Sequence, residues 1–162
     1  MVRWFRIYGD YFCGFWLAGC VLFAIQELPY AVMPFLSLPA NVLMEMEIER
    51  PVLEIMEKIF GVLTVVLLVM LVNGKIERFP FGTWRDKSFF IFAMLFLSTY
   101  FTGWYFYFNG HQSVALILSL LVAPPPLYYM SLGLWQRRWP LVVASAIFLI
   151  FHLANVWTNL TN

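Results

Sequence analysis

Long apolar runs separated by short polar stretches make up almost the whole chain. Five of these runs reach the length that a helix needs to cross a bilayer, about 20 mainly apolar residues. We expect them at residues 11–33, 51–73, 89–108, 113–134 and 141–158. The stretches between them are short, and none is long enough to form a separate extramembrane domain. The pattern therefore predicts an all-α fold, a single membrane domain over residues 1–162 built as a bundle of five transmembrane helices.

Prolines interrupt two of the predicted helices. Pro29 inside the first would remove one hydrogen bond and free the carbonyl of Ile25, so residues 28–40 are expected to bend or to re-enter the membrane. The run Pro124-Pro125-Pro126 should distort the fourth. Broken helices persist in membranes where protein or a cavity satisfies the backbone, and they occur at transporter binding sites. A rigid kink that only shapes packing is an equally good interpretation.

Composition supports a membrane protein and excludes other classes. Apolar residues make up 62% of the chain and charged residues 12%, whereas a soluble domain is roughly 45–50% apolar and about 25% charged. Such a chain has too few charges for a free-standing soluble globule or for a protein that binds nucleic acid. The lipid bilayer is the expected partner, and we expect no nucleic-acid partner. The expected location is the plasma membrane, crossed several times.

The basic residues predict an orientation. Cytoplasmic loops of membrane proteins carry an excess of Lys and Arg. With the N-terminus in the cytoplasm and the C-terminus outside, the inner loops are residues 74–88 and 135–140, and residues 37–50 form an acidic outer loop. The inner side then holds eight of the ten basic residues: Arg3, Arg6, Lys75, Arg78, Arg85, Lys87, Arg137 and Arg138.

The two cysteines do not indicate a disulfide or a metal site. Cys13 and Cys20 lie seven residues apart, about 10 Å along a helix, which is beyond disulfide reach. No Cys/His cluster is present, so we expect no metal and no cofactor. Leu17-Ala18-Gly19-Cys20 also has the form of a lipoprotein cleavage box, which leaves cleavage before Cys20 as an alternative.

The few polar residues inside the spans are the candidate functional residues, because ionisable groups are costly in a membrane. They gather in the outer halves of the predicted helices. Structural interpretations also exist: Glu27 could pair with Lys58 or a tyrosine hydroxyl, and His152 could join helices by hydrogen bonds. The positive end of the second helix explains Glu54 in its first turn, but it explains Glu57, one turn deeper, less well. We predict that the following residues line one ligand pocket: Gln26, Glu27, Glu57, Tyr100, Trp104, His152 and Asn155.

A carboxylate with aromatic neighbours favours an organic cation, through charge pairing and cation–π attraction. The leading prediction is therefore a protein that binds or transports a small amphipathic or cationic ligand through an outward-facing pocket. One alternative is an accessory subunit that assembles with a membrane-protein partner, in which the polar residues only hold helices together. A second is an intramembrane enzyme that uses Glu27 or Glu57 with His152 for proton transfer on a lipid-like substrate. Of these, we favour the functions without catalysis.

Overall fold

The computed structural model describes residues 1–36, 38, 41–43, 45–46, 50–77 and 79–161. The chain is mainly helical. In order, the helices are α1 (Leu17–Val32), continued by a 3-10 turn (Met33–Phe35), then α2 (Pro51–Met70), α3 (Trp84–Phe108), α4 (Val114–Leu116), the π-helical η2 (Ile117–Val122), α5 (Pro124–Trp135) and α6 (Trp139–Thr161).

Four helical stretches are long and apolar enough to cross a membrane: 17–35, 84–108, 114–135 and 139–161. Helix α2 has 20 residues, but its first two turns carry Glu54, Glu57 and Lys58. The structure is thus compatible with a membrane protein, in agreement with the composition.

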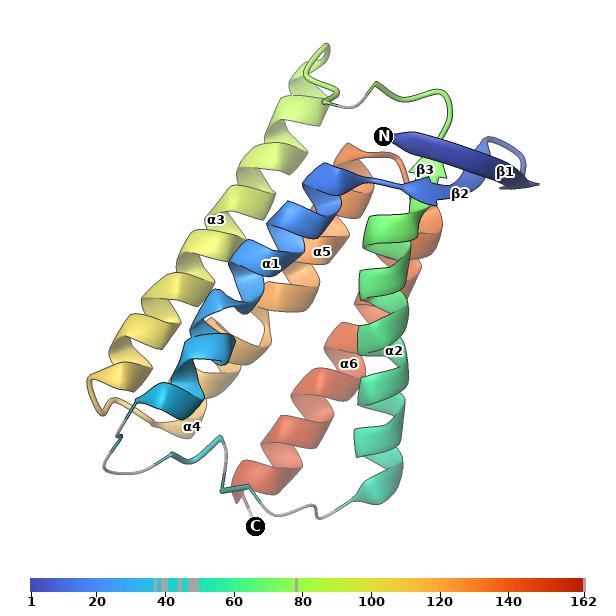
Figure 1. Ribbon diagram of the computed structural model, residues 1–162. Coiled ribbons are helices and arrows are strands. Elements are labelled where there is room, and N and C mark those ends of the chain that lie inside the picture. Colours follow the sequence, from blue (N-terminus) through green and yellow to red (C-terminus); the bar gives the residue numbers. More distant parts are fainter. Residues whose placement is uncertain (37, 39–40, 44, 47–49, 78, 162) are drawn as a thin grey trace.

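The long helices form a bundle in which α3 packs on α5, α5 on α6 and α6 on α2 (Figure 1). Helix α1 lies in front of this row. At one end α1 and α2 are held together, because the amide of Trp16 donates to the carbonyl of Val69 at 2.8 Å. A Cβ atom on Gly19 would lie 2.9 Å from the carbonyl oxygen of Leu68, so the two helices touch backbone to backbone there. Toward the other end α1 and α2 diverge (Figure 1).

The N-terminal boundary of the first predicted helix is wrong. Residues 11–15 are a strand, and α1 begins only at Leu17. Strands β1 (Val2–Tyr8), β2 (Tyr11–Phe15) and β3 (Leu71–Asn73) form an antiparallel sheet in the order β1-β2-β3. Tyr8 pairs with Tyr11, which leaves Gly9-Asp10 as a two-residue turn with Gly9 at φ +54°. Glycine adopts this φ at no steric cost, and that stabilises a hairpin over a continuous helix.

The other predicted spans need smaller corrections. The second helix ends at Met70, because residues 71–73 pair with β2. The third begins five residues earlier than expected, at Trp84, where the side chain of Thr83 accepts a hydrogen bond from the amide of Asp86 in a capping box. The fourth runs over 114–135 and the fifth over 139–161.

The prolines disturb the helices less than expected. Helix α1 continues through Pro29 to Val32. Pro124 is the first residue of α5, where a missing amide costs nothing within that helix, and a π-helical segment joins it to α4. Residues 114–135 therefore count as one span with a π-helical segment rather than a broken helix. The expected bend at 28–40 becomes the 3-10 turn, and Ser37, Pro39 and Ala40 lie outside the described residues.

The sheet holds the turn between α5 and α6. The carbonyl oxygen of Arg137 accepts from Asn73 Nδ2 at 2.9 Å and from the Tyr11 hydroxyl at 3.3 Å. Arg138, expected in an inner loop, is fully buried. Its guanidinium donates to the carbonyl of Leu68 at 2.8 Å and lies 4.3 Å from the centre of the Trp16 ring. A cation near the last carbonyls of α2 is favoured by the helix dipole.

Two apolar clusters make the core. One lies near the sheet and includes Trp16, Leu68 and Trp135; the other lies near the opposite end and includes Met33, Tyr107 and Ile117. Cys13 and Cys20 are free and half-buried, and they lie on β2 and α1 rather than on one helix.

Candidate functional site

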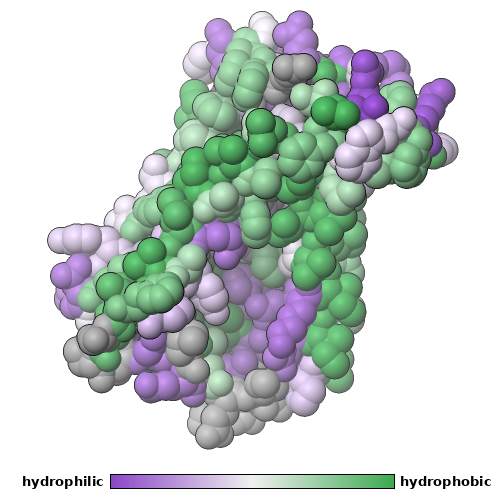
Figure 2. All heavy atoms as spheres, viewed as in Figure 1, coloured by the Kyte–Doolittle hydropathy of each residue, from purple (hydrophilic) through white to green (hydrophobic). Residues whose placement is uncertain are grey.

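All seven predicted pocket residues line one cavity of about 520 Å³ between α1, α2, α3, α5 and α6. The cavity lies where α1 and α2 diverge. Figure 2 shows hydrophilic residues gathered in a hollow between these two helices, bordered by hydrophobic surface on both sides. The volume is within the usual range of small-molecule sites.

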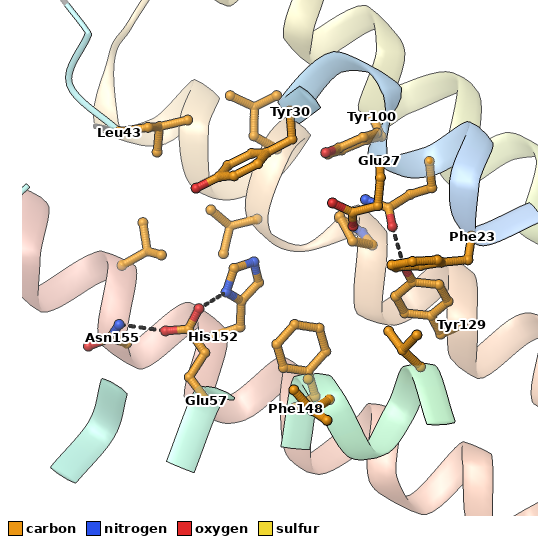
Figure 3. Close-up of a pocket in the computed structure, with 18 of the residues that line it drawn as sticks. Phe23, Glu27, Tyr30, Leu43, Glu57, Tyr100, Tyr129, Phe148, His152 and Asn155 are labelled. Atoms are coloured by element: carbon orange, nitrogen blue, oxygen red, sulfur yellow. Dashed lines mark hydrogen bonds and ion pairs between the residues drawn. The ribbon is translucent and has the colours of Figure 1, made fainter. Parts of the chain in front are cut away.

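One wall carries a hydrogen-bonded group of three polar side chains. The carboxylate of Glu57, on α2, accepts from Asn155 on α6 and lies 2.7 Å from His152 Nδ1 on the same helix (Figure 3). His152 and Asn155 are three residues apart, so one helix face presents both to Glu57. Phe148, one turn before His152, stacks on the imidazole with 4.9 Å between the ring centres. Glu57 is therefore satisfied by α6, and His152 faces Glu57 rather than Glu27.

Across the cavity, α1 contributes Gln26 and Glu27. Gln26 is buried and accepts a hydrogen bond from the hydroxyl of Tyr129, on α5. Glu27 is half-buried, and Figure 3 shows its carboxylate directed into the cavity beside Tyr30 and Tyr100. Within the described residues, Glu27 forms no ion pair. Lys58 pairs with Glu54 one turn away, so the interpretation in which Lys58 neutralises Glu27 is wrong.

Aromatic rings form the wall beside Glu27. Tyr100 and Trp104 are almost fully buried on α3, and their ring centres lie 6.0 Å apart at an interplanar angle of 87°. Tyr30 meets Trp104 edge to face, also at 6.0 Å. Tyr107, on the same stripe of α3, does not reach the cavity: its hydroxyl donates to Asn41 at 2.8 Å and accepts from the amide of Leu43 at 3.0 Å. These two hydrogen bonds hold Asn41 and Leu43, and Leu43 borders the cavity.

Sequence reasoning missed several lining residues. Tyr30 had a signal, because it follows Glu27 by three positions and so shares its helix face. Tyr129, on α5, lines the cavity and donates to Gln26, a contact between distant parts of the chain. The apolar side of the cavity had no distinctive signal, since its aliphatic residues look like any lipid-facing or core positions: Gly61, Val62, Val65, Val66, Leu121 and Val122.

The cavity thus holds two carboxylates, Glu57 bonded to His152 and Asn155, and Glu27 without an ion pair among the described residues. Aromatic and aliphatic side chains surround both. A carboxylate without a cationic partner in apolar surroundings is stabilised by a bound cation. In the part of the chain that the structure describes, no three His, Cys, Asp or Glu side chains come together in the manner of a metal site. No protein family, curated protein or solved structure matches the chain.

Proposed function

We propose that the protein is a membrane protein that binds an amphipathic organic cation in the cavity between α1 and α2, and carries it. The observation that supports this most directly is the Glu27 carboxylate, which lies among Tyr30, Tyr100 and Trp104 without a cationic partner among the described residues. The aromatic rings add cation–π attraction, and the valines of α2 offer a surface for an apolar tail.

The proposal includes the arrangement in the membrane. Helix α2 would also cross the membrane, which brings the number of spans to five. Its 20 residues extend about 30 Å, the thickness of the hydrocarbon core. The N-terminal end would face the cytoplasm, the cavity would open toward the outer half, and the membrane would be the plasma membrane. The hollow between α1 and α2 would then face lipid, so an amphipath could enter from the bilayer.

Replacement of Glu27 tests the proposal. Tetraphenylphosphonium, a bulky apolar cation, is titrated into the purified full-length protein in detergent and the heat of binding is measured. We expect Glu27→Gln to weaken binding at least tenfold, which corresponds to about 1.4 kcal/mol. Glu54→Gln is the matched control, because Glu54 already pairs with Lys58 and does not line the cavity. Equal affinity in wild type and Glu27→Gln, or no binding by the wild type, would contradict the proposal.

A second candidate function, proton coupling, is favoured by the contact between Glu57 and His152. Glu57 orients the imidazole through Nδ1, and among the described residues no hydrogen bond to Nε2 is found. An imidazole held in this way can exchange a proton with a ligand or with water. If His152 carries a proton during transport, vesicles of His152→Gln should still bind the cation but should not accumulate it when a pH gradient is imposed. Accumulation equal to wild type would exclude this role.

The same pair would serve an enzyme that moves a proton on a lipid-like substrate. That alternative predicts loss of turnover in His152→Ala with retained folding.

A further inference from the structure

A second cavity, of about 290 Å³, lies at the end of the bundle that carries the sheet. It is lined by residues of α3, α5, α6 and the turn before α6: Arg85, Gly133, Leu134, Arg137, Trp139 and Val142. It shares no lining residue with the cavity around Glu27. Helix α3 begins at Trp84 and α6 at Trp139. This cavity therefore lies at the first turns of two apolar helices, beside the polar end of the bundle.

The two charged residues in this lining are both arginines. Arg137 Nη2 lies 3.3 Å from the carboxylate of Asp86, and its side chain is about half exposed. Arg85 forms no ion pair within the described residues, and its guanidinium lies 5.4 Å from the centre of the Phe89 ring. The carboxylate of Asp86 neutralises only one of the two guanidinium groups, so these three side chains together carry a net positive charge. A guanidinium group can donate two parallel hydrogen bonds to two oxygens of one phosphate group.

The backbone of Arg137 gives a second, independent observation. Arg137 has φ +50°, and among the described residues it is the only non-glycine with a positive φ. Its amide donates to Leu134 and the amide of Arg138 donates to Gly133, the pattern that ends a helix with a left-handed residue. Glycine is the usual residue there, because a side chain is strained in this conformation. At this position, which favours glycine, the arginine places its guanidinium both beside Asp86 and in the lining of the cavity.

We propose that Arg85 and Arg137 bind the phosphate group of an anionic membrane phospholipid. The cavity lies at the depth where headgroups meet the first turn of the spans, and basic pockets between membrane helices are suited to such headgroups. Trp139, exposed at the rim, has the amphipathic ring that favours this level of a bilayer. The ligand is thus held at the opposite end of the molecule from the cation site.

The test measures thermal unfolding of the full-length protein in neutral detergent with added phosphatidylcholine, phosphatidylglycerol or inorganic phosphate. Because a ligand that binds only the folded state raises the unfolding midpoint, we expect phosphatidylglycerol to raise it by several degrees over phosphatidylcholine. Arg85→Gln and Arg137→Gly should each lose most of this shift. Lys87→Gln is the matched control, since Lys87 is exposed on the same helix and does not line the cavity.

The variants separate binding from folding. Arg137→Gly relieves the strained backbone but also removes the ion pair with the buried Asp86, so the shift of each variant is measured from its own midpoint without lipid. Arg137→Lys keeps the charge but not the fork, and should keep only part of the shift. A shift with inorganic phosphate as large as with phosphatidylglycerol would support the phosphate site and assign it to a soluble ligand. No preference for phosphatidylglycerol, or an equal loss in Lys87→Gln, would overturn the proposal.

Discussion

At the scale of single residues, Gly103 decides how closely α3 approaches the π-helical segment. A Cβ atom there would lie 2.7 Å from Leu120 Cβ and 2.8 Å from the carbonyl oxygen of Leu120. Because part of the obstacle is backbone, a side chain at this position would push α3 and η2 apart. The glycine therefore also sets the position of its neighbour Trp104, in the aromatic wall of the cavity around Glu27.

Gly103→Ala should lower the free energy of unfolding by about 1–3 kcal/mol, the usual range for overpacking a core. The direction of this change in stability is informative. Where space allows, alanine stabilises a helix by about 1 kcal/mol relative to glycine, so a loss of stability indicates overpacking. Gly82→Ala is the control, since no atom lies within 4 Å of a Cβ at Gly82. Thermal unfolding of both variants checks this, and a Gly103→Ala midpoint at or above that of wild type would contradict the close contact.

The residues that line the cavity around Glu27 could be predicted from the sequence only in part. The rise per residue places Glu27, Glu57 and His152 in the outer halves of the predicted helices, although the first helix begins at Leu17 and not at residue 11. In the structure the three residues line one cavity. The spacing of Glu54 and Lys58, four positions apart, could have predicted their pairing, in place of the expected pair of Lys58 and Glu27. The contact between Gln26 and Tyr129 spans 103 positions and depends on which helices are neighbours. No periodicity in a single sequence carries that information.

At the scale of elements, the N-terminal hairpin ties three parts of the chain together. The hydroxyl of Tyr11 donates to the carbonyl of Arg137 and accepts from the amide of Trp139, both at 3.3 Å. Strand β2 also pairs with β3, which directly follows α2. The hairpin thus links the start of α1, the end of α2 and the turn between α5 and α6.

Tyr11→Phe should therefore destabilise the protein by about 1 kcal/mol, the usual net contribution of a hydrogen bond. It should also speed hydrogen exchange at the amide of Trp139, which loses its acceptor. Tyr8→Phe is the matched control in the same hairpin, since the Tyr8 side chain is exposed. If the two variants exchange equally at Trp139, the hairpin does not hold the turn.

The hairpin could have been predicted. Residues 2–15 are rich in aromatic and β-branched residues, and Gly9-Asp10 between two such runs is a hairpin signal. Hydropathy concealed it, because Tyr11–Phe15 continues without a polar break into the apolar run of α1. The end of the second helix had no comparable signal. Leu71 and Val72 are apolar like the helix before them, and they become a strand because β2 lies beside them.

At the scale of the whole molecule, charge is divided between the two ends of the bundle. The sheet end carries most of the basic residues, among them Arg3, Arg6, Lys75 and Lys87, whereas Arg78 lies outside the described residues. The opposite end carries Glu45, and Glu47 and Glu49 lie outside the described residues. The N-terminus and the C-terminus lie at opposite ends (Figure 1), which agrees with an odd number of crossings.

The number of crossings can be measured on the full chain. After replacement of Cys13 and Cys20 by serine, one cysteine is introduced at a time as Tyr8→Cys, Gly82→Cys or Thr161→Cys, and intact cells are treated with a maleimide that does not cross membranes. Five spans with a cytoplasmic N-terminus predict labelling of Thr161→Cys in intact cells, and of the other two variants only after permeabilisation. If α2 stays outside the membrane, Tyr8→Cys and Gly82→Cys must label from opposite sides. That outcome would contradict the five-span arrangement, because the sheet places these two segments at the same end of the bundle (Figure 1).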